Sequence, residues 1–145
     1  SLLTCWVTAA LAPALTAVTK LPLRIKAPND LYVHNKKLGG ILVETRSSKA
    51  TPQQRQAVLG IGINVHQQHK DFSEILQQTA TSVTIACAED ALAKKNVPSM
   101  ETILATLLDA LEDSRNLLQE NPDLLKTRYQ KLLQPTALIH KNQHS

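Results

Sequence analysis

Apolar positions recur at helical spacing over residues 2–19, and Val7, Leu11, Leu15 and Val18 fall on one stripe. This spacing predicts a helix with one buried face. Pro13 lies inside the stretch and predicts a kink or a local restart of the helix. The pattern ends at Lys20.

The pattern then changes to the period of two that is typical of strands. Residues 23–26 alternate apolar and charged side chains, residues 31–33 form a short apolar run, and residues 38–44 form another that contains Gly39 and Gly40. Turn residues at 27–30 and 34–37 separate these runs, which predicts a hairpin. Residues 45–55 are polar and predict a loop before an apolar strand over residues 57–65.

The second half of the chain has mostly helical spacing. Residues 72–82 predict a helix, and residues 83–87 are ambiguous. Ser99 is the predicted N-cap of a longer helix, and Asn121 followed by Pro122 predicts the start of another, which Pro135 ends. The predicted buried stripe of the longer helix is Leu104, Leu107, Leu108, Leu111 and Leu118. The order of helix, strands and helices predicts an α+β fold with a mixed, mainly antiparallel sheet flanked by helices.

Composition narrows the class of protein. With 145 residues, 43% hydrophobic and 19% charged, the chain fits one globular domain. The net charge of +4 comes from scattered residues without interleaved aromatics, so we expect no nucleic-acid partner, although an anionic ligand such as ATP would suit a local positive field. Cys5 and Cys87 form no metal motif and favour a reducing, cytoplasmic location. The apolar opening is interrupted by Thr residues and Pro13, and it lacks a basic leader, so we expect neither a membrane span nor a signal peptide.

Three short blocks carry the candidate chemistry. They are RIKAPNDLY at residues 24–32, KLGGILVE at residues 37–44 and GIGINV at residues 60–65. Their order and spacing resemble the catalytic domain of the biotin–protein ligase family, with its K-W-P-N-D, K-[LIV]-[AG]-G-[IVM]-L-[VA]-E and G-[IA]-G-[IL]-N patterns. The resemblance covers residues 1–135. It implies part of the fold shared by class II aminoacyl-tRNA synthetases and biotin ligases.

The resemblance implies an ATP-dependent ligase that forms biotinyl-AMP and transfers biotin to a Lys of a biotin carboxyl-carrier protein. ATP, biotin and Mg²⁺ are the implied cofactors and substrates. It also implies a homodimer as one state of the chain. Because the sequence has no apolar run long enough to span a membrane, we expect no membrane partner.

The same resemblance assigns roles to individual residues, each with a structural alternative. Lys26 is the implied catalytic and biotin-binding residue, because a Lys at a strand end can stabilise charge on an acyl phosphate; otherwise it is a solvated strand-end side chain. The implied biotin-binding residues also include Leu31, otherwise a core residue, and Gly40, otherwise part of a bulge. The implied nucleotide-binding residues are Asn29 and Asp30, otherwise turn-capping residues, and Asn64, otherwise a strand-end tie.

A metal site is not expected. His66 and His69 are three residues apart, but no cysteine or carboxylate accompanies them at a ligand spacing.

The chain departs from the family pattern in several places. Ala27 stands where the family has Trp, and Arg46 stands where some members have an adenine-binding Asn. Nothing matches the family's G-R-G-R-x-G-R loop, and the chain begins without Met inside an apolar run. We therefore expect residues 1–135 to be the second half of a ligase domain, weak or inactive alone. Residues 136–145 are then a polar tail, without the family's small C-terminal domain.

Three alternatives remain open at this stage. One is a lipoate–protein ligase-like enzyme, which would have a similar Lys and Asn-Asp turn. Another is a non-catalytic binding or dimerisation fragment, in which the glycine-rich strands form a dimer edge. The third is the product of a decayed gene, which the Ala27 substitution and the unmatched loop would fit.

Overall fold

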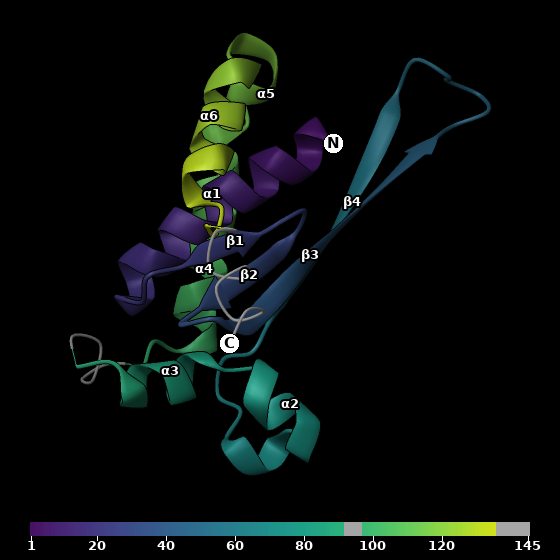
Figure 1. Cartoon of the computed structure of the whole chain (residues 1–145). Coiled ribbons are helices and arrows are strands. Elements are labelled where there is room, and N and C mark those ends of the chain that lie inside the picture. The colour runs from purple at the N-terminus through teal and green to yellow at the C-terminus, as the bar shows by residue number, and fades with distance from the viewer. Residues whose placement is uncertain (92–96, 136–145) are drawn as a thin grey trace, which may run out of the picture.

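The computed structural model describes residues 1–91 and 97–135 and confirms the predicted α+β class. The predicted tail, 136–145, lies outside the described residues. Helix α1 (Leu2–Thr19) precedes four strands, and helices follow them (Figure 1). The strands are β1 (Arg24–Lys26), β2 (Asp30–Val33), β3 (Lys36–Ser47) and β4 (Arg55–Ile63). The later elements are the 3-10 helix η1 (His69–Asp71) and helices α2 (Glu74–Thr79), α3 (Val83–Glu89), α4 (Met100–Ser114), α5 (Leu117–Glu120) and α6 (Pro122–Leu132).

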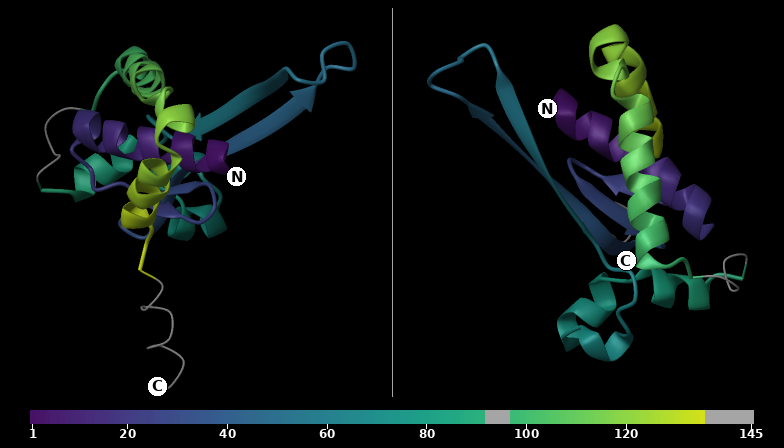
Figure 2. Two further views of the ribbon diagram at one scale, coloured as in Figure 1. Left: turned by 90° about the horizontal axis from the view of Figure 1, so that it is seen from above. Right: turned by 180° about the vertical axis from the view of Figure 1, so that it is seen from behind.

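The four strands form one sheet in the order β1-β2-β3-β4, and each pairs antiparallel with its neighbour. The register between β2 and β3 shifts so that Leu31 lies opposite Gly39 while Tyr32 lies opposite Lys37. This shift leaves Leu38 as an extra residue, which makes a β-bulge. Strands β3 and β4 pair over nine residues, from Gly39 to Ser47 on β3, and their far end projects away from the helices (Figures 1 and 2).

One face of the sheet packs on the helices. Helices α1, α4 and α6 lie together on the same side of the sheet (Figure 2), and α1 contacts both α4 and α6. The fully buried side chains come from this layer, and the largest include Leu11, Leu15, Leu21, Ile25, Leu31, Leu38 and Leu125. Aliphatic residues from the helices and from the inward positions of the strands therefore build a single core.

Helix α1 is the centre of that core. It runs unbroken through Pro13, which is exposed, so the predicted restart does not occur. By length and composition it could cross a membrane. However, Val7, Leu11 and Leu15 have no exposed surface. This burial is the arrangement of a core helix in a globular domain.

Three sequence predictions need correction. The predicted loop over 45–55 is shorter, because β3 continues to Ser47 and β4 begins at Arg55. The predicted helix over 72–82 is only α2, and the ambiguous residues after it start α3, capped by the Ser82 side chain. The predicted stripe on α4 is wrong at Leu104 and Leu108, which are both 58% exposed, whereas Ile103 and Leu107 are buried.

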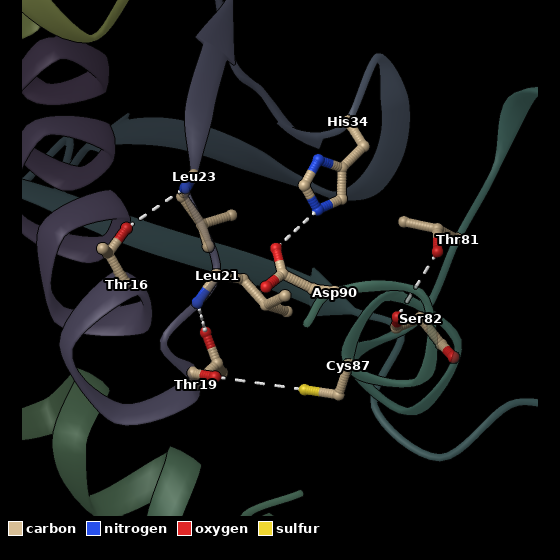
Figure 3. A network of polar contacts seen from close by, with 9 residues as sticks. All are labelled: Thr16, Thr19, Leu21, Leu23, His34, Thr81, Ser82, Cys87 and Asp90. Carbon is tan, nitrogen blue, oxygen red and sulfur yellow. Dashed lines mark hydrogen bonds and ion pairs between the residues drawn. The ribbon is translucent and has the colours of Figure 1, made fainter. Parts of the chain in front are cut away.

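Polar contacts join helix α3 to the end of α1 and to the turn between β2 and β3 (Figure 3). The Cys87 thiol points at the Thr19 carbonyl at 3.9 Å, and His34 Nε2 lies 3.0 Å from the Asp90 carboxylate. The Thr19 hydroxyl accepts from the Leu21 amide at 3.2 Å. The two contacts of Thr19 stabilise the turn after α1, which leads directly into β1.

The two edges of the sheet differ. Along β1, the Gln134 amide donates to the Ile25 carbonyl at 2.9 Å, and Leu133 forms a parallel bridge with Ile25. At the other edge, β4 has β3 as its strand neighbour on one side. Among the described residues, no strand pairs with its other side.

Candidate active site

The three sequence blocks meet on one row of the sheet. Lys26 of β1 lies opposite Asp30 of β2, and Asp30 lies opposite Gly40 of β3. Gly40 lies opposite Gly62 of β4. Residues opposite each other in a sheet point to the same face. Because the neighbouring Ile25 is fully buried, this row belongs to the face turned away from the helices.

A shallow groove of about 460 Å³ lies on this face. Its floor is glycine backbone from β3 and β4, and its polar residues come from the turn before β2 and the start of β3. The lining residues are Asn29, Asp30, Lys37, Gly40, Ile41, Leu42, Gly60, Ile61 and Gly62. The groove is thus built from all three sequence blocks.

Lys26 stands at the end of the row, beside the groove rather than in its lining. Its ammonium lies 5.2 Å from the centre of the Tyr32 ring, a cation–π arrangement. Lys26 is exposed, and within the described residues no carboxylate lies within ion-pair distance of it. Its positive charge is therefore not compensated by this part of the chain.

Asp30 and Lys37 form an ion pair in the groove, with Lys37 Nζ 3.1 Å from Asp30 Oδ1. Both side chains are partly exposed, so water screens the pair and its contribution to stability is small. A Cβ on Gly40 would lie 3.3 Å from Asp30 Oδ1 and 3.8 Å from Lys37 Nζ. Lys37 belonged to the second sequence block but was given no role, because only the register shift after Leu38 reveals its position.

The absence of a side chain has a different structural reason at Gly39 than at Gly62. A side chain on Gly39 would collide with the backbone oxygen of Gly62, so Gly39 is needed for the sheet itself. Above Gly62, however, a Cβ would meet nothing closer than the Gly40 oxygen at 4.0 Å. The open space above Gly62 is not explained by packing within the described chain, and it leaves backbone accessible to a ligand.

Two of the predicted nucleotide-binding residues, Asn29 and Asn64, make hydrogen bonds that connect neighbouring segments of the fold. The side-chain amide of Asn29 donates to the Ile41 carbonyl at 2.7 Å. The backbone N–H of Ile41 donates to the backbone carbonyl of Asn29 at 3.0 Å. These bonds fasten the Pro28 turn to β3, instead of closing the turn on itself. The Asn64 amide donates to the Thr81 carbonyl at 3.2 Å, which ties the end of β4 to the start of α3 and fits the strand-end alternative.

Leu31 does not reach the groove. It follows Asp30 on β2, and successive side chains of a strand point to opposite faces. Leu31 accordingly has no exposed surface and packs in the core with Ile25. Among the described residues Leu31 therefore lies outside this groove and matches the core alternative.

The described residues contain no cluster of three or more His, Cys, Asp or Glu side chains that could hold a metal ion. Asp30 is the carboxylate among the groove-lining residues, and it is engaged by Lys37. The groove therefore does not provide a donor set for Mg²⁺ from its own side chains.

Comparison with known proteins shows that part of the chain is similar to a family of ligases. The model of the biotin/lipoate A/B protein ligase family matches residues 1–64, which contain the first two blocks and nearly all of the third. The bifunctional ligase/repressor BirA of Bacillus spizizenii is 38% identical over 80 residues, which are 55% of this chain and 24% of that protein. BirA of Bacillus subtilis is 43% identical over 65 residues, or 45% of this chain and 19% of that protein.

Solved structures extend the likeness in fold beyond the matched sequence. The apo biotin protein ligase of Aquifex aeolicus superposes with a TM-score of 0.71 at 22% identity, over 92% of this chain and 53% of that one. The biotin protein ligase of Leishmania major in complex with biotinyl-5-AMP gives a TM-score of 0.64 at 18% identity, over 92% and 53%. The chain thus spans 24% and 19% of the two BirA relatives and about half of these structures. Residues 1–64 of this chain are thus similar to the biotin/lipoate A/B protein ligase family, and the described residues have the fold of biotin protein ligases.

Proposed function

We propose that the groove is part of a biotin–protein ligase active site. In the proposed reaction a biotin carboxylate oxygen attacks the α-phosphorus of ATP, and pyrophosphate leaves. A Lys amine of a carboxyl-carrier protein then attacks the acyl carbon of biotinyl-AMP, and AMP leaves. The observation that carries the proposal is the single sheet row on which Lys26, Asp30, Gly40 and Gly62 meet.

The similar structures support the choice of ligand. The Aquifex aeolicus biotin protein ligase is known in complex with biotin and ATP, and its TM-score to this chain is 0.69. The Leishmania major enzyme is known in complex with biotinyl-5-AMP. Biotin and ATP are accordingly the substrates we propose for this chain.

We assign to Lys26 the role of binding the acyl phosphate of biotinyl-AMP. Lys37 is neutralised by Asp30 at 3.1 Å, whereas no described carboxylate pairs with Lys26. An uncompensated ammonium beside the groove stabilises the negative charge that develops on the phosphate as AMP leaves. The bare backbone at Gly40 and Gly62 lets the ligand lie against the sheet.

Mg²⁺ accompanies the phosphates of ATP in our proposal and neutralises part of their charge. Because the groove supplies no set of carboxylates for it, none of the roles assigned to Lys26, Asp30 or the glycines depends on the ion.

Direct binding of biotinyl-AMP tests the proposal without requiring turnover. We expect calorimetry to detect binding to the unaltered chain, and Lys26→Ala to weaken it by about 10- to 100-fold, because a lost charged hydrogen bond costs about 1.5–3 kcal/mol. Lys126→Ala, which removes an exposed Lys on α6, is the matched control and should bind as the unaltered chain does. No binding to the unaltered chain, or equal weakening by both substitutions, would contradict the proposal.

Biotin-dependent exchange of pyrophosphate into ATP measures the chemical step. We expect the chain alone to show little exchange, because water must be kept from the reactive adenylate and the groove is shallow and open. Exchange near the rate of an intact ligase would show that the groove needs nothing further to close it.

Lipoate is the second candidate substrate, because the matched family includes lipoate ligases. Heat protection separates the two, since a ligand that binds only the folded chain raises its melting temperature. We expect biotin with ATP to protect, and lipoate with ATP to have no effect. The reverse result would assign the site to lipoate.

We also propose a reducing, cytoplasmic location, which the free thiols of Cys5 and Cys87 support. Differential alkylation of the protein in its source cells tests this, because both thiols should be reduced there.

A further inference from the structure

A second groove lies on the helical side of the molecule, where α1 contacts α4, α5 and α6 (Figure 1). One hollow of about 680 Å³ lies among these four helices. A neighbouring hollow of about 400 Å³ lies among α1, β1 and the end of α6. Pro13 and Leu132 line both hollows, so the two form one elongated surface, here called the helical groove.

The floor of the helical groove consists of short side chains from α1. Ala9, Pro13 and Ala17 are spaced four residues apart and therefore lie on one face of the helix. Leu11 and Leu15, which are fully buried in the core, belong to another face. Because the distance between packed helices depends on the side chains between them, this floor lets a further helix approach α1 closely.

Basic side chains line the part of the helical groove next to α6 and β1. Arg128 and Lys131 lie three residues apart on α6, and Arg24 belongs to β1. The Arg24 guanidinium donates to the Lys131 carbonyl at 3.3 Å, which holds it beside α6. Within the described parts of the chain, none of these three cations has a carboxylate within ion-pair distance. Asp113 lines the groove from α4 and likewise forms no ion pair there.

The shape and charge of the helical groove favour an acidic helix over a small ligand. The cations extend from β1 to α6, so they match several carboxylates better than a single one. The floor runs from Ala9 to Ala17, about 12 Å along the helix, which is a little over two helical turns. The groove is also open on its outer side, whereas a small-molecule site usually buries most of its ligand.

We propose that the helical groove docks an acidic amphipathic helix of a partner protein. The apolar face of that helix lies on the α1 floor, and its carboxylates pair with Arg24, Arg128 and Lys131. Complementary charges of this kind select the partner and speed its association. The helical groove shares no lining residue with the groove of the candidate site, so this docking does not depend on the proposed function.

A pair of synthetic peptides tests the docking on the full chain. The first is a helix of about 18 residues, long enough to form in isolation, with Leu and Ala in one stripe and Glu on both flanks. The second carries Lys in place of each Glu. We expect the acidic peptide to bind at least about tenfold more tightly, because the lysine peptide brings like charges together.

Nuclear magnetic resonance locates the binding. The indole N–H of Trp6, the single tryptophan of the chain, donates to the Ser114 hydroxyl at 2.8 Å, and Ser114 lines the groove. The indole signal and the backbone amide signals of α1 and α6 should therefore shift when the acidic peptide is added.

A double charge reversal tests the basic side chains. Arg128→Glu with Lys131→Glu should weaken binding of the acidic peptide by about tenfold or more. Lys70→Glu with Lys126→Glu is the matched control, because it changes the net charge equally at exposed lysines that line neither hollow. The control should bind nearly as the unaltered chain does.

Pro13→Glu tests the floor. Pro13 is exposed within α1, and Glu is the better helix former, so the variant should keep its fold while it places a carboxylate in the path of the acidic helix. We expect it to weaken binding by about tenfold or more. Urea unfolding of each variant at the midpoint of the unaltered chain separates lost docking from lost folding.

Several results would overturn the proposal: no binding of the acidic peptide, equal binding of both peptides, equal effects of the two double variants, or signal shifts confined to other elements. Decanoate that binds the groove where the acidic peptide does not would assign it to a small carboxylate instead. Dimerisation of the chain alone that the Arg128 and Lys131 reversal abolishes would assign the groove to a second copy.

Discussion

The two edge strands of the sheet, β1 and β4, differ in how much of the chain packs beside them. At the β1 end, Gln134 bonds to Ile25, and the Tyr129 hydroxyl donates to the Pro28 carbonyl at 2.9 Å, so segments about a hundred residues apart in sequence are joined. At the β4 end, no strand of the described residues pairs with the outer side of β4, and an apolar groove lined by Ile61, Ile63 and α4 is exposed. At the β1 end, segments of the same chain thus bond to the strand and its neighbouring turn. The β4 end presents surfaces that a partner or ligand can contact.

This difference separates stability from function along the sheet. Ile25 and Leu31 are fully buried at the β1 end. Gly60 and Gly62, at the β4 end, line a groove and contribute little packing. Substitutions at the first end should therefore change the free energy of unfolding, and substitutions at the second should change binding.

The largest expected effect compares two adjacent leucines of α4. Leu107 is buried and Leu108 is 58% exposed. We expect Leu107→Ala to lower the free energy of unfolding by about 2–5 kcal/mol and Leu108→Ala to change it by at most about 0.5 kcal/mol. Urea unfolding checks this. Equal losses would mean that the α4 face is covered in solution by another molecule.

The next effect compares two glycines. Gly39→Ala should destabilise the chain by about 1–3 kcal/mol, because the added Cβ meets the Gly62 backbone. Gly62→Ala should leave the unfolding free energy nearly unchanged and weaken biotinyl-AMP binding, because it fills open space above the groove floor. Thermal unfolding and calorimetry measure the two quantities. Unchanged binding by the Gly62 variant would argue against a ligand at that position.

A smaller effect is expected at the β1 end. Tyr129→Phe removes the bond to Pro28 and should cost about 0.5–1.5 kcal/mol. Tyr32→Phe is the control, since it removes the other tyrosine hydroxyl, which makes no comparable bond to a distant segment within residues 1–91 and 97–135. If both variants unfold at the same urea concentration, the α6 contact does not contribute to stability.

The smallest effect concerns alkaline pH. Burial, and then the negative charge of Asp90, raise the pKa of the Cys87 thiol. As the pH rises, the thiol ionises first in the unfolded chain, so its contribution to stability is present below the unfolded pKa and is lost as the pH rises through the folded one. From about pH 7 to about pH 10, the free energy of unfolding should therefore fall less in the Cys87→Ala variant than in the unaltered chain. Cys5→Ala serves as the control, and an identical alkaline loss in the Cys87 variant would refute this account.

Local signals in the sequence were sufficient for much of the fold. Ser99 was predicted as an N-cap and accepts a bond from the Thr102 amide at 3.1 Å, because capping depends on a few neighbouring residues. The stripe on α4 was wrong at Leu104 and Leu108, since periodicity identifies apolar positions but not whether anything covers them.

The candidate site was predictable in its residues but not in its assembly. Lys26, Asp30 and Gly40 belong to recognisable blocks, yet their meeting on one row depends on strand register. Lys37 was missed because the bulge at Leu38 sets its position. The burial of Leu31 could have been predicted, because it alternates with Asp30 along β2.

The projecting end of β3 and β4 has a consequence for engineering. Ser47 pairs with Arg55, so the intervening segment is closed by a long ladder that holds its two ends together. Each doubling of a flexible loop costs only about 0.6 kcal/mol in closure entropy. This tip should therefore accept an inserted tag or a whole fluorescent domain with little loss of stability. Such an insertion would place a reporter at the far end of the strands that form the groove floor.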